Sequence, residues 1–173
     1  MSEASSRGRV VVERRCRADI ADVWALWTTE EGFESWWGPQ GFRVEVRQLE
    51  PRVGGALSYD MIADTPEMVA AMEEMGQAAR HGTRACFTEF RPRERIVITN
   101  VIDFIRGVPA YESQIVVDFA VVGDHVQMAV TLDVMHDDEM TRMQEEGFRS
   151  QLAKLDARFD EWPSTAKPRL TDA

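Results

Sequence analysis

Hydrophobic residues recur at every second position over several stretches of this chain, and this alternation constrains the fold more than any other feature of the sequence. Phe42, Val44 and Val46 alternate with charged residues, and the pattern returns after a turn rich in proline and glycine at residues 51–55. A period of two is typical of a strand with one buried and one wet face. Short connections between such strands favour an antiparallel meander. Strands are predicted at residues 10–16, 42–47, 57–61, 83–90, 95–105, 111–122 and 125–135.

The C-terminal part of the chain carries a helical pattern instead. Asp137-Asp138-Glu139 suit the start of a helix, because acidic side chains cap its first turn and complement its positive end. Pro163 is expected to end this helix, which leaves residues 163–173 as a polar tail. The apolar residues that form one long face of the helix are Met140, Met143, Phe148, Leu152, Leu155, Phe159 and Trp162.

Two shorter helices are predicted before the first hairpin. Asp19 suits the N-cap of a helix over residues 19–28, with apolar residues at helical spacing behind it. Thr28 or Thr29, followed by two glutamates, suits the N-cap of a second helix. Gly38-Pro39 then closes that helix, since neither residue continues a helix well.

The second short helix ends in two adjacent tryptophans, Trp36 and Trp37. Neighbouring residues on a helix point about 100° apart, so the two rings cannot share one narrow buried stripe. We expect the pair to close the two helices against the sheet. Trp37 is then a candidate for the wall or floor of an apolar cavity.

The connection between the third and fourth predicted strands contains a further helix, over about residues 65–79. Thr65 suits its N-cap and Pro66 its first position. Its apolar face is rich in methionine, a flexible side chain that adapts to varied apolar surfaces. Three roles remain open for this face: packing on the protein's own sheet, a lid over a cavity mouth, or a homodimer contact. The face consists of Met68, Met72, Met75 and Ala79.

Composition narrows the class of protein. The chain has 173 residues, of which 44% are hydrophobic, enough for one domain with a full core. A net charge of -10 disfavours nucleic acid as a partner, because such binding needs a basic face. Residues 1–9 lack the apolar core of a signal peptide, and no apolar run is long enough to span a bilayer. We therefore expect a cytoplasmic protein with no membrane partner, and reduced thiols at Cys16 and Cys86.

The chain shows no established catalytic or cofactor motif. His81, His125 and His136 are far apart in sequence and do not have the spacing of metal ligands, so neither a metal nor another cofactor is expected. No nucleophile elbow, phosphate-binding loop or dinucleotide fingerprint is present. The sequence thus leaves an enzymatic role undecided and favours a non-catalytic one.

If the protein is an enzyme, Glu89 and Tyr59 are the first acid–base candidates. Glu89 shares strand parity with Phe87, and a carboxylate turned inward would have a raised pKa and could act as a general base. The same residue could instead face water or pair with an arginine such as Arg84 or Arg95. Tyr59 offers a hydroxyl at the end of an apolar ring, suited to orient a ligand.

Several segments resemble a known family, the bacterial relatives of the activator of the ninety-kilodalton heat-shock protein ATPase. This branch belongs to the SRPBCC or START-like superfamily, which also contains the birch-pollen allergen. The resemblance covers about residues 8–162. It departs from the family pattern at Val122–His125, where a glycine-rich turn is usual, at Phe148, where tryptophan is usual, and in the long connection at residues 63–82. The segments that carry it are Leu26–Phe42, Glu50–Met61, Thr88–Thr99 and Glu145–Leu155.

The resemblance implies an α+β helix-grip fold as a single domain over residues 1–173. A curved antiparallel sheet of about six or seven strands would wrap around the long C-terminal helix, with two short N-terminal helices and the extra helix between strands three and four. An apolar cavity would lie between sheet and helix. The residues expected to line it are Trp37, Phe42, Tyr59, Met61, Phe87, Asn100, Phe119, Met128, Phe148 and Leu152.

Three functions follow from this resemblance. The first is a non-catalytic carrier or sensor that binds a small hydrophobic ligand in the cavity. The second is an enzyme of the cyclase, dehydratase or hydrolase kind that acts on a hydrophobic substrate. The third is a co-chaperone that stimulates a heat-shock ATPase, although the eukaryotic activator has a further N-terminal domain for which this chain has no room.

Overall fold

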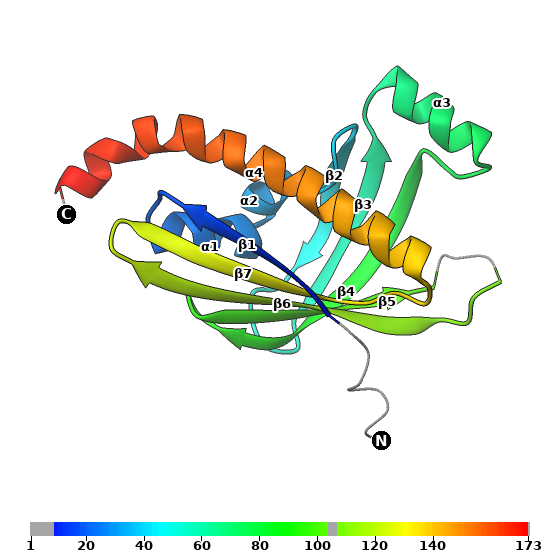
Figure 1. Ribbon diagram of the computed structural model, residues 1–173, viewed down its shortest axis with the longest axis horizontal. Coiled ribbons are helices and arrows are strands. Elements are labelled where there is room, and N and C mark those ends of the chain that lie inside the picture. The colour runs from blue at the N-terminus through cyan, green and yellow to red at the C-terminus, as the bar shows by residue number, and fades with distance from the viewer. Residues whose placement is uncertain (1–8, 104–106, 173) are drawn as a thin grey trace.

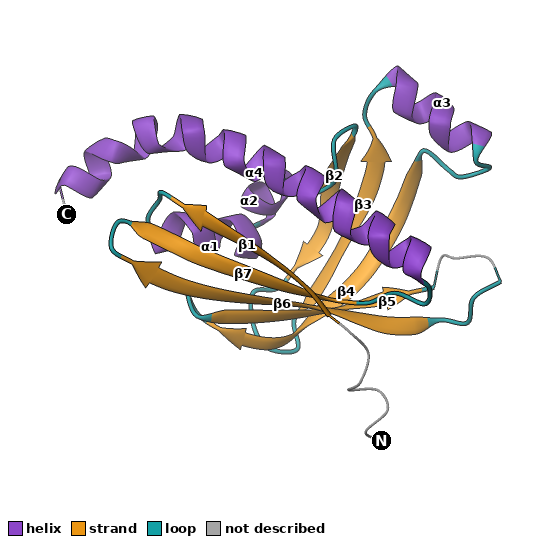
Figure 2. Ribbon diagram, viewed as in Figure 1, coloured by secondary structure: helices purple, strands orange, loops and turns teal. Residues whose placement is uncertain are grey.

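Seven antiparallel strands form one curved sheet, and the long helix α4 crosses its concave side (Figures 1 and 2). This computed structural model describes residues 9–103 and 107–172, with side chains up to residue 155. The strand order is β1-β7-β6-β5-β4-β3-β2, so the first strand lies beside the last and the others follow the chain. The elements are β1 (Arg9–Cys16), α1 (Ile20–Thr28), α2 (Glu30–Glu34), β2 (Phe42–Leu49), β3 (Ala56–Ala63), α3 (Pro66–Glu74), β4 (Arg80–Arg91), β5 (Arg95–Ile102), β6 (Tyr111–Val122), β7 (His125–Asp133) and α4 (Asp138–Asp172).

The predicted α+β helix-grip layout is confirmed, including the extra helix between the third and fourth strands. β5 ends at Ile102, and the predicted extension of this strand to residue 105 falls largely on residues 104–106, outside the described part of the chain. None of the described helices is apolar enough over a sufficient length to cross a membrane.

Helix α3 is shorter than predicted. It ends at Glu74 rather than near residue 79. Gly76 has a φ of 70°, a left-handed conformation that glycine adopts without steric cost. The backbone N–H groups of Gly76 and Gln77 bond back to carbonyls of the last turn at 3.0 and 2.8 Å. This is the usual glycine stop of a helix, and the sequence does contain its signal.

Helix α4 is longer than predicted. It continues to Asp172, whereas the sequence predicts an end at Pro163 and a polar tail over residues 163–173. A proline removes one backbone hydrogen bond and crowds the preceding turn, but a long helix can accommodate this as a bend rather than an end. Two of the predicted apolar positions, Phe159 and Trp162, lie outside the described side chains.

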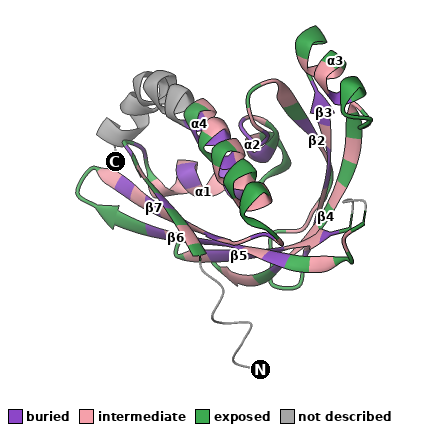
Figure 3. Ribbon diagram, turned by 45° about the vertical axis from the view of Figure 1, so that its right-hand side comes forward, coloured by how far each residue is buried: buried purple, intermediate pink, exposed green. Residues whose placement is uncertain are grey.

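The concave face of the sheet, the helix pair α1–α2 and α4 share one hydrophobic core (Figure 3). The register of the strands places Ile96 and Ile98 of β5 inward, opposite Val117 and Ile115 of β6. Aromatic rings from the helix pair fill the space between sheet and α4. The ring cluster comprises Trp24, Trp27, Phe33, Trp36, Trp37, Tyr59, Phe87, Phe90, Phe119 and Phe148.

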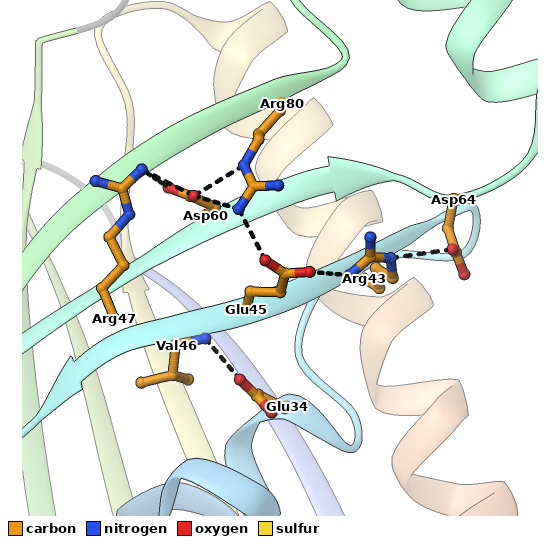
Figure 4. Close-up of polar contacts among 8 residues, drawn as sticks. All are labelled: Glu34, Arg43, Glu45, Val46, Arg47, Asp60, Asp64 and Arg80. Carbon is orange, nitrogen blue, oxygen red and sulfur yellow. Dashed lines mark hydrogen bonds and ion pairs between the residues drawn. The ribbon is translucent and has the colours of Figure 1, made fainter.

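A chain of ion pairs covers the outer face of β2, β3 and the start of β4 (Figure 4). The side chain of Asp60 is only 2% exposed, and it accepts hydrogen bonds from Arg47 at 2.8 Å and Arg80 at 2.9 Å. Arg80 also contacts Glu45, which accepts a bond from Arg43 at 2.6 Å. The bond from Arg47 is the main cause that holds the pKa of Asp60 below its ordinary value. The resulting stabilisation is present at neutral pH and is lost as the pH falls through that lowered pKa.

The outer edge of β2 is covered by two charged side chains. Glu34, the last residue of α2, accepts a hydrogen bond from the backbone N–H of Val46 at 2.7 Å. Lys154 of α4 donates to the carbonyl oxygen of Phe42 at 2.8 Å. Burial lowers the pKa of Lys154, because desolvation disfavours the charged ammonium form.

Candidate functional site

The helix pair α1–α2 positions the two adjacent tryptophans. Asp19 caps α1 and Thr29 caps α2, and each side chain accepts a backbone N–H of the first turn. Trp36 turns back under α1, where its indole Nε1 donates to the carbonyl of Leu26 at 2.9 Å. Trp37 turns toward the sheet. The prediction that the two rings serve different surfaces is confirmed.

Trp37 joins the sheet to helix α4. Its indole Nε1 donates to the hydroxyl of Tyr59 on β3 at 3.0 Å. The ring of Phe148 on α4 meets Trp37 edge to face, with centroids 5.7 Å apart. Phe33 stacks on its other side at 4.6 Å. Trp37, Tyr59 and Phe148, which are predicted as cavity residues, therefore lie together.

Polar contacts hold α4 against the segment that follows Trp37. The backbone N–H of Gly38 donates to the side-chain oxygen of Gln151 at 3.0 Å. The N–H of Gln40 donates to the hydroxyl of Ser150 at 2.9 Å. Gly38 has a φ of 94°, so a glycine is required for the chain to turn there. These bonds fix the height of α4 above the sheet.

One half of the concave face is closed and apolar. Trp27 covers it from α1, and its indole Nε1 lies 3.3 Å from the sulfur of Met128 on β7. Phe119 of β6 meets the ring of Trp24 at 5.5 Å. Leu152 of α4 is fully buried against the same core. The predicted residues Phe119, Met128 and Leu152 thus serve as core packing in this half.

The other half of the concave face carries polar groups, which we call the polar half: Tyr59, Thr83, Asn100 and Ser113. Tyr59 lies directly opposite Thr83 on β4. Asn100 lies between Ala85 of β4 and Ser113 of β6 in the ladder. Their inward direction follows from strand parity with core residues on the same strands.

Solvent reaches part of this polar half. Asn100 and its neighbour Ala85 are half-buried, although both lie on the inner face of central strands. Thr83 is also half-buried. In a fully packed core the inner face of a central strand is closed, as it is at Ile98 on the same strand β5. Space accessible to water therefore adjoins these side chains inside the grip.

Tyr59 is a hydrogen-bonding group rather than an acid at neutral pH. Burial raises the pKa of its hydroxyl to about 12, against the opposing effect of hydrogen bonds with Trp37 and Thr83. The phenol therefore keeps its proton throughout the physiological range.

Two buried polar atoms near α4 and the sheet lack a protein partner. Ser113 is 1% exposed, and its hydroxyl oxygen makes no hydrogen bond among the described residues. Gln151 is 4% exposed, and its side-chain nitrogen is likewise unpaired within that part of the chain. An unpaired buried polar group is costly, so each such group indicates a place where a water or a ligand completes the bonding.

Glu89 does not face the core, so the orientation in which its carboxylate turns inward as a general base is not the one observed. A β-bulge shifts the β4–β5 register between Phe87 and Glu89. The extra residue reverses the parity, so Phe90 turns inward and Glu89 outward. Glu89 forms ion pairs with Arg91 at 2.7 Å and Arg95 at 3.4 Å, as in the alternative that paired it with an arginine.

The remaining predicted cavity residues lie along the inner side of the grip. Phe87 is fully buried beside Ile98. Phe42 and Met61 are half-buried near the free edge of the sheet. Sequence reasoning missed Thr83 and Ser113. Thr83 shares strand parity with Phe87, and Ser113 shares it with Ile115, which indicates that both face inward. This signal is weak, because hydroxyl residues are equally common on the solvent-exposed faces of strands.

The predicted lid residues separate in the structure. Met72 is 8% exposed. Met68 packs against Gly41, where an added Cβ would come within 2.8 Å of the methionine methyl group. Met75 is 62% exposed and contributes little to packing. Figure 1 shows α3 at the end of β3 and β4, and its main contact is with β3.

The histidines lie at different places. Burial lowers the pKa of His81, which faces inward opposite Met61. His136 contacts the hydroxyl of Tyr111 through Nδ1 at 3.0 Å. His125 borders a hollow of about 300 Å³ at the opposite end of the sheet, together with Ile20 and Val121. Within the described residues, no three His, Cys, Asp or Glu side chains are arranged to hold a metal ion.

Comparison with known proteins gives a family and a fold. Residues 17–160 match the family described as Activator of Hsp90 ATPase homolog 1-like protein. A crystal structure of a Chromobacterium violaceum protein has a TM-score of 0.71 at 20% identity, over 86% of this chain and 94% of that one. The AHSA1 protein of Silicibacter pomeroyi has a TM-score of 0.69 at 20% identity, over 88% and 98%.

A third structure, of an Arthrobacter aurescens protein in solution, has a TM-score of 0.70 at 21% identity, over 88% of this chain and 86% of that one. Among curated proteins, none matches. At these identities the structures show a shared fold and nothing about ligands. The family match spans most of the chain, and it agrees with the resemblance carried by the segments around Trp37 and Phe148. The chain is a member of the Activator of Hsp90 ATPase homolog 1-like family.

Proposed function

We propose that this protein binds a small, largely apolar ligand inside its grip, as a carrier or sensor without catalysis. The observation that carries the proposal is the solvent-accessible polar half of the concave face, where Thr83 and Asn100 adjoin apolar walls. Binding sites of this kind combine many apolar contacts with a few oriented polar groups. We place this activity in the cytoplasm.

The apolar walls come from three elements. Phe148 of α4 is 5% exposed and sits above Trp37. Phe87 and Ile98 close the inner end, next to the apolar half. A ligand in this position would exchange water for contacts with aromatic rings, which favours binding of apolar compounds.

An enzymatic role has less support. The leading general base, Glu89, faces outward and is paired with arginines. The second candidate, Tyr59, has a pKa of about 12, too high for proton exchange near neutral pH. A cyclase, dehydratase or hydrolase would need other groups in the grip.

A co-chaperone role is the second candidate function, and the family description is the observation in its favour. It predicts that the purified protein stimulates a heat-shock ATPase. No stimulation at saturating protein would remove this candidate.

Native mass spectrometry of the protein from its own host tests the ligand proposal. We expect a stoichiometric adduct that is released on denaturation and identified as a small, largely apolar compound. A titration of the emptied protein with the neutral dye N-phenyl-1-naphthylamine should then show saturable binding at one site per chain. A clean apo mass together with no saturable dye binding would overturn the proposal.

We further propose that α3 acts as a lid. Replacement of Met68, Met72 and Met75 by serine should speed the entry of N-phenyl-1-naphthylamine by several-fold, because the Met68 and Met72 side chains would no longer hold α3 against its neighbours. Stopped-flow fluorescence measures the entry rate. Gel filtration of the same variant distinguishes the alternatives: an unchanged entry rate with a shift from dimer to monomer would instead assign this face to a homodimer.

A further inference from the structure

We propose that β1 pairs with β1 of a second copy of this chain, antiparallel and about a twofold axis at Val11, so that two sheets join into one. This interaction does not depend on the proposed ligand-binding function. The free side of β1 has the backbone direction, the charge pattern and the exposed apolar side chain that such a pairing needs.

β1 lies at one edge of the sheet, beside β7 (Figure 1). Within the described part of the chain, no strand pairs with its other side. Val122 and His125 flank the two-residue turn between β6 and β7 and lie directly opposite each other, so they form a hydrogen-bonded pair. The backbone groups of every second residue from His125 onward therefore face β6, and those of the intervening residues of β7 face β1. In β1 the partners of these intervening residues are Val10, Val12, Arg14 and Cys16.

The other residues of β1 direct their N–H and C=O groups away from β7, because successive residues of a strand alternate in this direction. The Glu13 carbonyl agrees with this assignment, since it accepts a hydrogen bond at 3.0 Å from the exposed side chain of Arg14. A second strand could form two hydrogen bonds with each residue that points this way. These residues are Arg9, Val11, Glu13 and Arg15.

The charges of β1 select one register. Residues that point to the free side meet only one another, on one face of the joined sheet. With the axis at Val11, Arg9 of each copy lies opposite Glu13 of the other. A shift of two residues instead places Arg9 opposite Arg15, a shift of four places Glu13 opposite itself, and a shift of six places Arg14 opposite itself. A shift the other way leaves only residues 9–11 of β1 overlapping. Opposite charges across a ladder are stabilising and like charges are destabilising, so the first register is favoured.

The second copy would supply a charge that Glu13 does not find within its own chain. Glu13 is exposed and forms no ion pair among the described residues. Arg9 lies 3.2 Å from Asp133 of β7, but its side chain is still 52% exposed. A guanidinium has five N–H donors, so Arg9 can contact Asp133 and the Glu13 of a second copy together.

The apolar side chains of β1 fit the same register. Val11 is 54% exposed on the outer face, beside Thr131 of β7. At the axis the two copies of Val11 would cover each other. On the concave side Val10 would lie opposite Val12 of the other copy, and pairs of β-branched residues stabilise a ladder.

A mixture of two charge-reversed variants tests the register. Arg9→Glu brings carboxylates together at both ends of the pairing, and Glu13→Arg brings guanidinium groups together. We expect each variant alone to dimerise at least about ten-fold more weakly than the unmodified protein, as measured by sedimentation velocity. An equimolar mixture should recover the dimer, because opposite charges then meet at both ends. A variant that only misfolds would not be rescued by mixing.

A cysteine at the axis tests the geometry. In an antiparallel hydrogen-bonded pair the Cα atoms are about 5.5 Å apart, within the range of a disulfide. We expect Val11→Cys, combined with Cys86→Ser to remove the half-buried thiol, to form a cross-linked dimer on oxidation. Thr131→Cys in the same background lies on the same face but one strand in from the edge, so it should stay monomeric.

Three results would overturn this dimer, and each leaves the ligand-binding proposal untouched. The first is an unmodified protein that sediments as a monomer at every concentration. The second is a mixture of the charge-reversed variants that associates no better than either variant alone. The third is cross-linking of Thr131→Cys as readily as Val11→Cys, since random collision would then explain both.

Discussion

Replacing Trp36 with alanine is expected to lower the free energy of unfolding by about 4 kcal/mol, the largest single effect that we predict. The side chain is fully buried, and its ring meets those of Trp27 and Trp37 at 4.9 and 5.2 Å. The variant loses these contacts and leaves a cavity that neighbouring rings cannot fill without leaving their own positions. Urea denaturation followed by circular dichroism measures the loss.

A second part of this effect is polar. The carbonyl of Leu26 lies in the last turn of α1, where it has no partner within the helix, and the Trp36 indole supplies one at 2.9 Å. Trp36→Phe keeps most of the ring but removes this bond, so we expect a loss of about 2 kcal/mol. If Trp36→Phe were as stable as the unmodified protein, the bond to Leu26 would not contribute to stability.

Replacing Gly55 with alanine is expected to cost about 3 kcal/mol, through backbone overlap rather than through strain in φ. An added Cβ would lie 2.0 Å from the carbonyl oxygen of Glu50 and 2.9 Å from that of Arg52. The turn cannot easily move away, because Gly55 and Gly54 form backbone hydrogen bonds with Phe87 at 2.9 and 2.7 Å. Thermal and urea denaturation measure the change.

Gly54 provides the matched control for this prediction. It has a φ of 76° but no atom within 4 Å of an added Cβ. Gly54→Ala therefore introduces only the strain of a left-handed conformation, about 1 kcal/mol. Equal losses for the two neighbouring variants would show that the turn relaxes around Gly55 and that overlap is not the cause.

Features that depend only on residues close together in the chain could be predicted from the sequence. Asp19 and Thr29 cap the two short helices because a side-chain oxygen bonds an N–H only two or three residues away. The alternation at Phe42, Val44 and Val46 gave the correct inner face of β2. The fold class followed from such hydrophobic periods together with the family resemblance. The family match over residues 17–160 confirms that resemblance.

Features that depend on strand register or on contacts between distant residues could not be predicted from the sequence. The bulge before Glu89 reverses the parity of β4, and a shift of one residue moves a side chain to the opposite face. Trp37 donates to the hydroxyl of Tyr59, which lies 22 positions away in the chain. No local pattern carries that information. Local rules predict that the helix stops at Pro163, whereas α4 extends past it.

The covered edge of β2 limits how this sheet can associate with another chain. An exposed edge strand offers unpaired N–H and carbonyl groups on which a foreign strand can add. Here Glu34 occupies the N–H of Val46 and Lys154 occupies the carbonyl of Phe42, so a strand approaching β2 would have to displace two charged groups. The opposite edge, β1, is therefore the side on which strand addition, and with it any dimer built by extending the sheet, would begin.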